Sequence, residues 1–507
     1  MKLPRPPNWL VVLVATAATV AVAAAPTPAG LTPEGQRALA TGVFAASLWI
    51  TGALPLPVTA LTVPFWLAAL GVYPTLAESL SGFADPVVFL FLSTFVLAAA
   101  LQKHGLDRRV ALRLLGRVGT TPRRVVLGVM VPTAGLSMLI SNTATVALMA
   151  PIAVGIVRQI DATAEESVGN LHTAALLGVA YAGSIGGIGT LVGTPPNAIV
   201  VSALADAGYE VDFVEWLAIG LPTVAATLPL AWYLLVSLYP PEEVDVSAAR
   251  RSARETATSA GALDRTAKRV AVVFLAVATL WLVGGLGFLF EPLLSSRWYT
   301  TLFGSEGGAG DAGWFLGAGD YQGLLYFVTV GLAAIPVLFL VGGVEWDDVE
   351  RIDWGTLLLF GGGLSLADAL ADTGATEWLA AGVVRSLGTA PLVVLLAAVV
   401  ALTVALSELA SNTATAALLA PVLIEVGGDL PAAGVDAALL LPIASAVAAS
   451  YGFALPVATP PNAIVFGTGE VTRGQMLRAG SVLDVVFVFV TTAVLLALAV
   501  TVLPGVV

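Results

Sequence analysis

The sequence has no cysteine, only two histidines and few charged residues. The absence of cysteine among 507 residues excludes disulfides, thiolate nucleophiles and thiolate metal sites. His104 and His172 each lie near a predicted membrane boundary and do not predict an imidazole metal centre. Charged residues make up 11% of the chain and hydrophobic residues 58%, with a mean hydropathy of +0.93. This balance excludes a soluble globular protein and is typical of one embedded in a lipid bilayer.

Lysine is also scarce, since it occurs only at positions 2, 103 and 268. Most of the 22 basic residues are therefore arginine, and 34 acidic residues leave a net charge of −12. A high-salt host and a GC-rich coding bias both account for this pattern. Outside the short loops expected in the cytoplasm there is no basic patch with interleaved aromatic residues, so nucleic acid is not an expected partner.

Two polar motifs interrupt the apolar sequence, and each occurs twice. Ser141-Asn142-Thr143-Ala144-Thr145 returns unchanged at residues 411–415. The segment 194–200, Thr-Pro-Pro-Asn-Ala-Ile-Val, returns unchanged at residues 459–465. The same order at nearly the same separation predicts two homologous halves, as in transporters built from inverted repeats.

Apolar windows predict about eleven transmembrane helices, so we expect an all-α, multi-pass membrane protein. The windows are residues 8–25, 38–53, 56–72, 86–102, 172–192, 217–239, 269–290, 322–342, 354–371, 437–457 and 479–503. Residues 8–25 also resemble a signal peptide, and a retained first helix is the preferred interpretation.

Two further apolar stretches, 122–156 and 391–426, are too long for one crossing and carry Ser-Asn-Thr near the middle. A re-entrant helical hairpin with its tip buried in protein satisfies both features. The expected organisation is an N-terminal helix or signal with its linker (1–37), a first inverted repeat (38–240), a cytoplasmic linker (241–268) and a second inverted repeat (269–507).

The distribution of positive charge predicts the orientation. With the N-terminus in the cytoplasm, cytoplasmic segments hold 19 of the 22 Lys and Arg residues, and only Arg37, Arg297 and Arg385 lie outside. The two halves then have opposite orientations. One hairpin enters from the cytoplasmic side and the other from the external side.

The motifs have a definite chemistry. The Asn amides and the Ser and Thr hydroxyls both donate and accept hydrogen bonds, and a tip at a helix N-terminus favours an anion. Because Pro-Pro cannot lie inside a regular helix, we expect unwound segments at 193–197 and 458–462, with carbonyls free to bind a small cation such as Na+. No titratable residue lies in these segments. Glu408 and Asp368 are the nearest, and for Glu408 a structural role within the hairpin is favoured over cation steering.

Taken together, two Ser-Asn-Thr tips and two Pro-Pro-Asn segments resemble the divalent anion/sodium symporter family of dicarboxylate, citrate and sulfate carriers. The resemblance covers nearly the whole chain from about residue 38. It implies a homodimer whose transport domain slides past a scaffold domain in an elevator motion. It also implies two sodium sites, formed by Ser137, Ser141, Asn142 and the Gly193 carbonyl, and by Ser407, Ala410, Asn412 and Ala458.

The same resemblance implies that the substrate carboxylates contact Asn142, Thr143 and Thr194 from one half and Asn412, Thr413 and Thr459 from the other. The leading hypothesis is therefore Na+-coupled symport of a C4 dicarboxylate (succinate, malate or fumarate) across the plasma membrane. A sulfate symporter and a Na+-independent dicarboxylate exchanger are the alternatives within the family. An ion channel or a Na+/H+ antiporter would be a different class, and no nucleophile–base pair or metal cluster indicates an enzyme.

Overall fold

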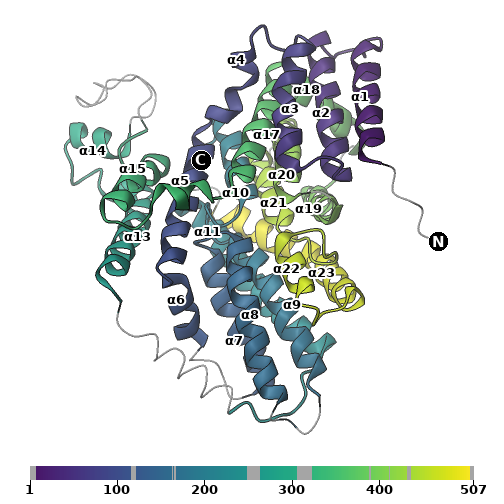
Figure 1. Cartoon of the computed structure of the whole chain (residues 1–507). Helices are drawn as coiled ribbons and strands as arrows, with labels where there is room; N and C mark the ends of the chain where they lie inside the picture. Colours follow the sequence, from purple (N-terminus) through teal and green to yellow (C-terminus); the bar gives the residue numbers. More distant parts are fainter. Residues whose placement is uncertain are drawn as a thin grey trace.

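The chain is helical throughout the part that the computed structural model describes, which comprises residues 7–115, 121–162, 164, 167–247, 263–304, 322–387, 390–409, 411–430 and 435–502. The helices form one elongated molecule, with α7 and α8 at one end and α1, α3 and α4 at the other (Figure 1). The expectation of an all-α protein is confirmed for these residues.

The helices follow one order twice. The first series is α2 (Pro33–Thr51), α3 (Leu56–Ala69), α5 (Pro86–Lys103), α6 (Leu106–Leu115), α7 (Pro122–Ser137), α8 (Asn142–Asp161), α9 (Gly169–Gly187), α10 (Pro195–Asp206) and α11 (Phe213–Leu238). The second is α13 (Arg265–Gly284), α15 (Phe327–Leu340), α17 (Trp354–Asp372), α18 (Ala375–Leu387), α19 (Leu392–Leu409), α20 (Asn412–Gly428), α21 (Ala437–Ala449), α22 (Pro460–Gly467) and α23 (Arg473–Thr501).

Six short or terminal elements complete the described chain. They are α1 (Asn8–Ala24), α4 (Leu76–Ser79), η1 (Ser81–Ala84), η2 (Gly287–Leu289), α14 (Ser296–Phe303) and α16 (Trp346–Glu350). The expected linker 241–268 lies partly outside the described residues, and α13 already begins at Arg265.

Local sequence explains where many helices begin. Thr32 accepts a hydrogen bond from Gly35 N, and Pro33 occupies the first helical position, where its missing N–H costs nothing. Reciprocal bonds between Asp212 and Glu215 start α11 as a capping box. Such caps satisfy N–H groups of the first helical turn that have no intrahelical partner.

Helix contacts divide the molecule into two bundles. In the outer bundle α3 packs on α17, α5 on α15, and α2 on α1 and α3. In the inner bundle α9 packs on α7 and α8, while α21 packs on α19 and α20. The second half of each broken helix crosses to the other repeat, because α10 packs on α20 and α22 packs on α8. The two repeats are thereby interlocked around the middle of the inner bundle.

Burial shows which helices are central. Every residue of α21 is buried, and so are all residues of α9 from Leu171 to Gly187 except His172. A helix that is apolar on all sides is stable only when surrounded by other helices. The hairpins and α11 and α23 provide that surrounding for α9 and α21.

Seven of the described helices are long and apolar enough to cross a membrane. They are α5, α8, α11, α13, α17, α19 and α23. Two of these, α8 and α19, are arms of the expected hairpins, because only residues 138–141 separate α7 from α8 and only 410–411 separate α19 from α20. Each hairpin extends slightly beyond its expected end, to Asp161 and to Gly428.

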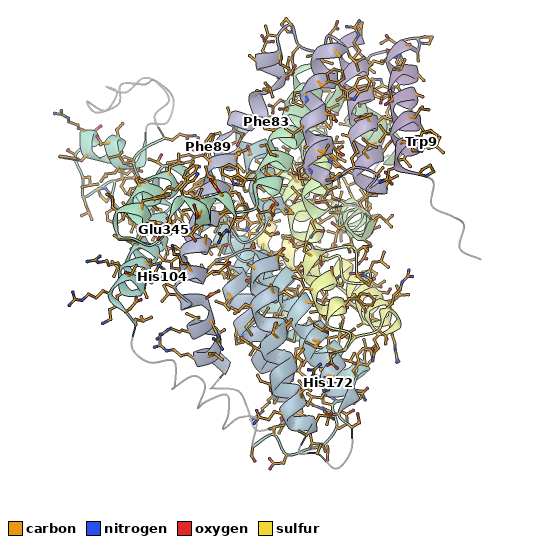
Figure 2. The ribbon with its side chains drawn as sticks, in the orientation of Figure 1. Trp9, Phe83, Phe89, His104, His172 and Glu345 are labelled. Carbon is orange, nitrogen blue, oxygen red and sulfur yellow. The ribbon has the colours of Figure 1, made fainter. Side chains whose placement is uncertain are left out.

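The two histidines lie on different parts of the molecule, as Figure 2 shows. His104 follows α5 and contacts the Gly343 carbonyl, whereas His172 lies on α9 beside Glu470. Within the described residues no group of three or more His, Asp or Glu side chains is arranged to hold a metal ion.

Candidate functional site

A cavity of about 1040 Å³ lies where the hairpin tips and the broken helices meet. Both tips and both Pro-Pro segments line it, together with residues of α1, α2, α5 and α17 from the outer bundle. All six residues expected to bind substrate line this cavity, namely Asn142, Thr143, Thr194, Asn412, Thr413 and Thr459. Residues separated by more than 300 positions in the chain thus share one space.

In the first half of the site, oxygen atoms gather around Asn142. The position of Asn142 Oδ1 lies 2.6 Å from Ser137 Oγ, 3.1 Å from the Gly183 carbonyl and 3.3 Å from the Gly193 carbonyl. Ser137 Oγ also donates a 2.6 Å hydrogen bond to Gly183 O. Two arrangements satisfy such a cluster. Either the amide turns to place Nδ2 there, or a cation binds among the oxygens.

Gly187 and Gly193 allow the unwound segment to approach Asn142 closely. A Cβ on Gly187 would lie 2.5 Å from Asn142 Oδ1, and a Cβ on Gly193 would lie 2.4 Å from the Gly187 carbonyl. Both distances are far shorter than a non-bonded contact permits. Any larger residue would therefore push Asn142 or the unwound segment out of place.

The unwound segments are 188–194 and 450–459 rather than the expected 193–197 and 458–462. The prediction of a break was correct, but Pro195-Pro196 and Pro460-Pro461 form the first turn of α10 and α22. Proline is tolerated there because the first N–H groups of a helix have no intrahelical partner. The pair of prolines therefore marks where the helix resumes, and the break precedes it.

One asparagine closes each break. Asn197 Nδ2 donates to Gly187 O at 3.0 Å and to Thr190 O at 2.8 Å, which are carbonyls of the break that precedes it. Asn462 Nδ2 makes the same pair of bonds to Gly452 O at 2.8 Å and Leu455 O at 3.0 Å. Sequence reasoning did not assign these two residues to the site, although their place in a motif that occurs twice was the available signal.

The second half of the site repeats this plan with differences. Ser407 Oγ donates to Ala449 O at 2.8 Å, and Asn462 N donates to Thr459 Oγ1 at 3.2 Å. Asn412 Oδ1 is buried without a hydrogen-bond partner, so it is an unsatisfied acceptor at the tip. Ala410, expected at the second sodium site, lies outside the described residues.

The expected sodium ligands lie at two depths. Asn142, Ser141, Gly193, Asn412 and Ala458 line the cavity, whereas Ser137 and Ser407 are fully buried behind the tips. The substrate residues also differ between halves, since Thr143 is exposed and its counterpart Thr413 is buried. These positions are compatible with the sequence-based assignment, which remains a prediction.

The sequence predicts a structural role for Glu408 within its own hairpin, but the carboxyl group instead contacts the segment between α21 and α22. Its two carboxylate oxygens accept hydrogen bonds from Ala454 N at 2.6 Å and Leu455 N at 2.9 Å, in the unwound segment between α21 and α22. The sequence could not show this contact, because the three residues meet only after α19 packs on α21.

The cavity contains little charge. Among the described residues that line it, Asp353 is the one charged side chain, and its oxygens accept bonds from the backbone N–H and the hydroxyl of Thr356. The remaining polar groups are hydroxyls, amides and backbone atoms. Two helix N-termini, those of α8 and α20, begin at the tips and add unpaired N–H groups that favour an anion.

Two helical hairpins and two broken helices lie around one cavity, one of each from each half of the chain, which is the arrangement expected of a membrane transporter built from inverted repeats. Comparison with protein families agrees, because residues 7–502 match the model described as the sodium:sulfate symporter transmembrane region. The chain belongs to this family of multi-pass membrane transporters, and its members are not enzymes.

Several named relatives are similar along most of their length. The chain is 33% identical over 469 residues to a protein named "Sodium-dependent dicarboxylate transporter SdcS" from Staphylococcus saprophyticus, which covers 89% of this chain and 84% of the relative. A protein of the same name from Staphylococcus aureus USA300 is 31% identical over 463 residues, with 89% and 84% covered. An uncharacterized transporter of Haemophilus influenzae is 36% identical, with 90% of each chain covered.

Two solved structures share the fold. The Alcanivorax borkumensis YdaH transporter superposes with a TM-score of 0.56 at 17% identity, covering 90% of this chain and 98% of that one. Neisseria gonorrhoeae MtrF, described as illuminating a class of antimetabolite efflux pumps, gives a TM-score of 0.56 at 13% identity, covering 97% and 94%. At these identities the likeness concerns the arrangement of helices alone.

Proposed function

We propose that the protein is a Na+-coupled symporter of a C4 dicarboxylate such as succinate, malate or fumarate. The names of the Staphylococcus relatives support sodium dependence and a dicarboxylate substrate. The observation that carries the proposal is the chemistry of the cavity, which offers an anion hydroxyls, amides and two helix N-termini but no basic side chain among its described lining residues.

A dianion needs compensating charge when it leaves water, because neutral donors alone do not offset the loss of its hydration. Bound Na+ supplies that charge. The oxygen cluster around Asn142 and the unsatisfied Asn412 Oδ1 lie beside the groups assigned to the substrate, so cations bound there would lie close to its carboxylates. Cation binding and substrate binding then stabilise each other.

We assign the first cation to Ser137, Ser141, Asn142 and the Gly193 carbonyl, and the second to Ser407, Ala410, Asn412 and Ala458. The substrate carboxylates are assigned to the hydroxyls and amides at the two tips and at Thr194 and Thr459. Each half of the site thereby provides one cation position and one end of a two-ended anion.

The orientation follows from the positive charges. If the N-terminus lies in the cytoplasm, the cavity opens to the cytoplasm, because Asn8, residues 49–53 and Asp353 line it and all lie at cytoplasmic helix ends in that topology. We propose that the inner bundle moves past the outer bundle to expose the site on the other side, in an elevator motion with eleven transmembrane helices per subunit. We further propose a homodimer.

Uptake into proteoliposomes tests the proposal. Labelled succinate should accumulate when Na+ is higher outside and should not when K+ replaces Na+. Uptake that is unchanged without Na+ would overturn the symport and favour exchange. Sulfate, which the family description names, is tested by competition in the same assay, and displacement of succinate by sulfate but not by malate would favour an inorganic anion carrier.

Removing a tip amide tests the assigned site. Asn142→Ala and Asn412→Ala should each abolish Na+-driven uptake, because each removes a candidate cation ligand and a candidate substrate donor. Both proteins should remain folded, as judged by size-exclusion chromatography and thermal unfolding. Wild-type uptake in either variant would contradict the assignment. Asn170→Ala is a matched control, because Asn170 is exposed and bonds Pro240 O away from the cavity.

A further inference from the structure

Glu408 is a carboxylate inside the inner bundle that no role described above has used. It is the next residue after Ser407 on α19, one turn before the second tip. Its Oε1 and Oε2 accept the N–H groups of two successive residues, Ala454 and Leu455, at 2.6 and 2.9 Å. A side chain that binds two adjacent backbone groups fixes the direction of the backbone as well as its position.

Leu455 is the centre of the unwound segment in the second repeat. Its N–H donates to Glu408, and its carbonyl accepts from Asn462 Nδ2 at 3.0 Å and from Ala458 N at 3.2 Å. Ala458 is the residue assigned to the second cation. It is therefore one hydrogen bond away from the residue that Glu408 holds.

The same arm of the hairpin also holds the other side of the break. Ser407 Oγ donates to Ala449 O, the last residue of α21, at 2.8 Å. Ser407 and Glu408 together connect α19 to the C-terminal end of α21 and to the unwound segment 450–459. The position of the tip relative to Ala458 is thereby set by two neighbouring residues.

In the first repeat the equivalent positions are also hydrogen-bonded, but the side chain comes from the unwound segment and the backbone group from the hairpin. Glu408 corresponds to Met138 and Leu455 to Thr190, by the alignment of the two motif pairs. There the Thr190 hydroxyl donates a short hydrogen bond to the Met138 carbonyl. The first repeat thus uses a neutral side chain of the unwound segment, whereas the second uses a carboxyl group of the hairpin. Asp484 of α23 also contacts Glu408.

We propose that Glu408 is a positioning residue of the second sodium site, holding the segment 450–459 so that the Ala458 carbonyl and the Asn412 tip meet around one cation. The proposal rests on the proposed function, since it needs a cation at the second tip. It predicts that the two cation sites differ in their dependence on Glu408. Loss of Glu408 affects the second cation, and the first site is unaffected because Met138 and Thr190 hold its segment.

The test is the Na+ dependence of Glu408→Gln in the full-length protein. A glutamine keeps the size of the side chain but has only one acceptor oxygen, and its NH₂ group faces an N–H. The Na+ concentration giving half-maximal succinate uptake should rise about tenfold, and the Hill coefficient for Na+ should fall toward one. Maximal uptake at saturating Na+ should fall much less, a split that general misfolding would not produce.

Glu350→Gln is the matched control, because it makes the same substitution at an exposed position of α16 that does not line the cavity. The Na+ dependence of its uptake should equal that of the wild type. Na+-dependent thermal stabilisation without substrate provides a second readout that does not require transport. In that assay Glu408→Gln should need about tenfold more Na+ for the same shift.

The outcomes separate this proposal from the proposed function. An unchanged Na+ dependence in Glu408→Gln, with Asn412→Ala losing Na+ stabilisation, would overturn the positioning role and leave the second sodium site in place. An equal loss in Glu408→Gln and Glu350→Gln would show that the loss is not specific to position 408 and would overturn the positioning role. Unchanged Na+ stabilisation in Asn412→Ala would overturn the second sodium site itself.

Discussion

Gly187 determines how closely the first broken helix approaches the first tip. It is the last residue of α9, its carbonyl accepts from Asn197, and a Cβ there would lie 2.5 Å from Asn142 Oδ1. Glycine is required at position 187 because any side chain there would collide with the Asn142 amide. The geometry of the first tip therefore depends on the absence of a side chain at Gly187 as well as on the groups that bind.

Gly187→Ala should therefore weaken the first cation site. Asn142 must move by several tenths of an ångström, and the expected loss of Na+ affinity is tenfold or more, about 1.4 kcal/mol. Na+-dependent thermal stabilisation measures it. Gly155→Ala on α8 is the control, because nothing lies within 4 Å of its added Cβ and alanine favours the helix by roughly 0.5–1 kcal/mol. Equal Na+ responses in the two variants would show that the contact is not limiting.

At the scale of elements, an asparagine side chain links the two segments of each broken helix. Asn197 and Asn462 are fully buried, and each donates two hydrogen bonds to carbonyls that have left the helix. Without the amide, Gly187 O and Gly452 O would lose the donor shown for them, whereas Thr190 O and Leu455 O would keep the bonds from Gly193 N and Ala458 N. The asparagine therefore makes an interruption of the helix tolerable in the membrane.

Asn197→Ala and Asn462→Ala should both destabilise the protein, because in each variant one carbonyl, Gly187 O or Gly452 O, loses the donor shown for it at a cost of about 1–3 kcal/mol. Thermal unfolding in detergent measures the effect, and the similarity of the two bond patterns predicts losses of similar size. Asn→Asp at either position should be at least as harmful, since a carboxylate cannot donate to a carbonyl. A loss confined to one repeat would contradict the equivalence of the two asparagines.

The positions of the hairpin tips and of the helix breaks can be predicted from the sequence. The extent of the breaks and the contact of Glu408 cannot, and each has a physical reason. The tips and the breaks were predicted because Ser-Asn-Thr and Pro-Pro interrupt apolar stretches and occur twice. The extent of each break was misplaced because proline is acceptable in a first helical turn. The contact of Glu408 with Leu455 depends on how α19 packs on α21, and the local pattern contains no information on that packing.

At the scale of the whole molecule, a direct hydrogen bond joins the two bundles. Ser202 of α10 donates to Asp85 Oδ2 at 2.6 Å, and Asp85 is the residue that caps α5. Burial raises the pKa of Asp85, while the hydrogen bonds from Ser202 and Val87 N lower it. If the inner bundle slides past the outer one, this bond must break in each cycle.

Ser202→Ala should therefore favour the alternative arrangement of the bundles. Loss of one bond to a carboxyl group is worth about 1.5–3 kcal/mol, enough to shift a balanced equilibrium by roughly tenfold or more. Spin labels on cysteines introduced at Leu402 of α19 and Leu332 of α15, both partly exposed, would report the distance distribution. No native cysteine competes for the label. An unchanged distribution would show that the bond does not bias the motion.

The near absence of charge around the cavity has a consequence for acid–base behaviour. Asp353 is the one titratable side chain among the described lining residues, and it lies at the start of α17 rather than at the tips. The groups that would hold the substrate therefore keep the same charge across the physiological range. At saturating Na+, where binding at the second sodium site does not limit uptake, a pH profile should then follow the second ionisation of the transported acid, and it should move when fumarate replaces succinate. Under that condition the cargo, rather than the residues that line the cavity, would set the proton dependence of transport.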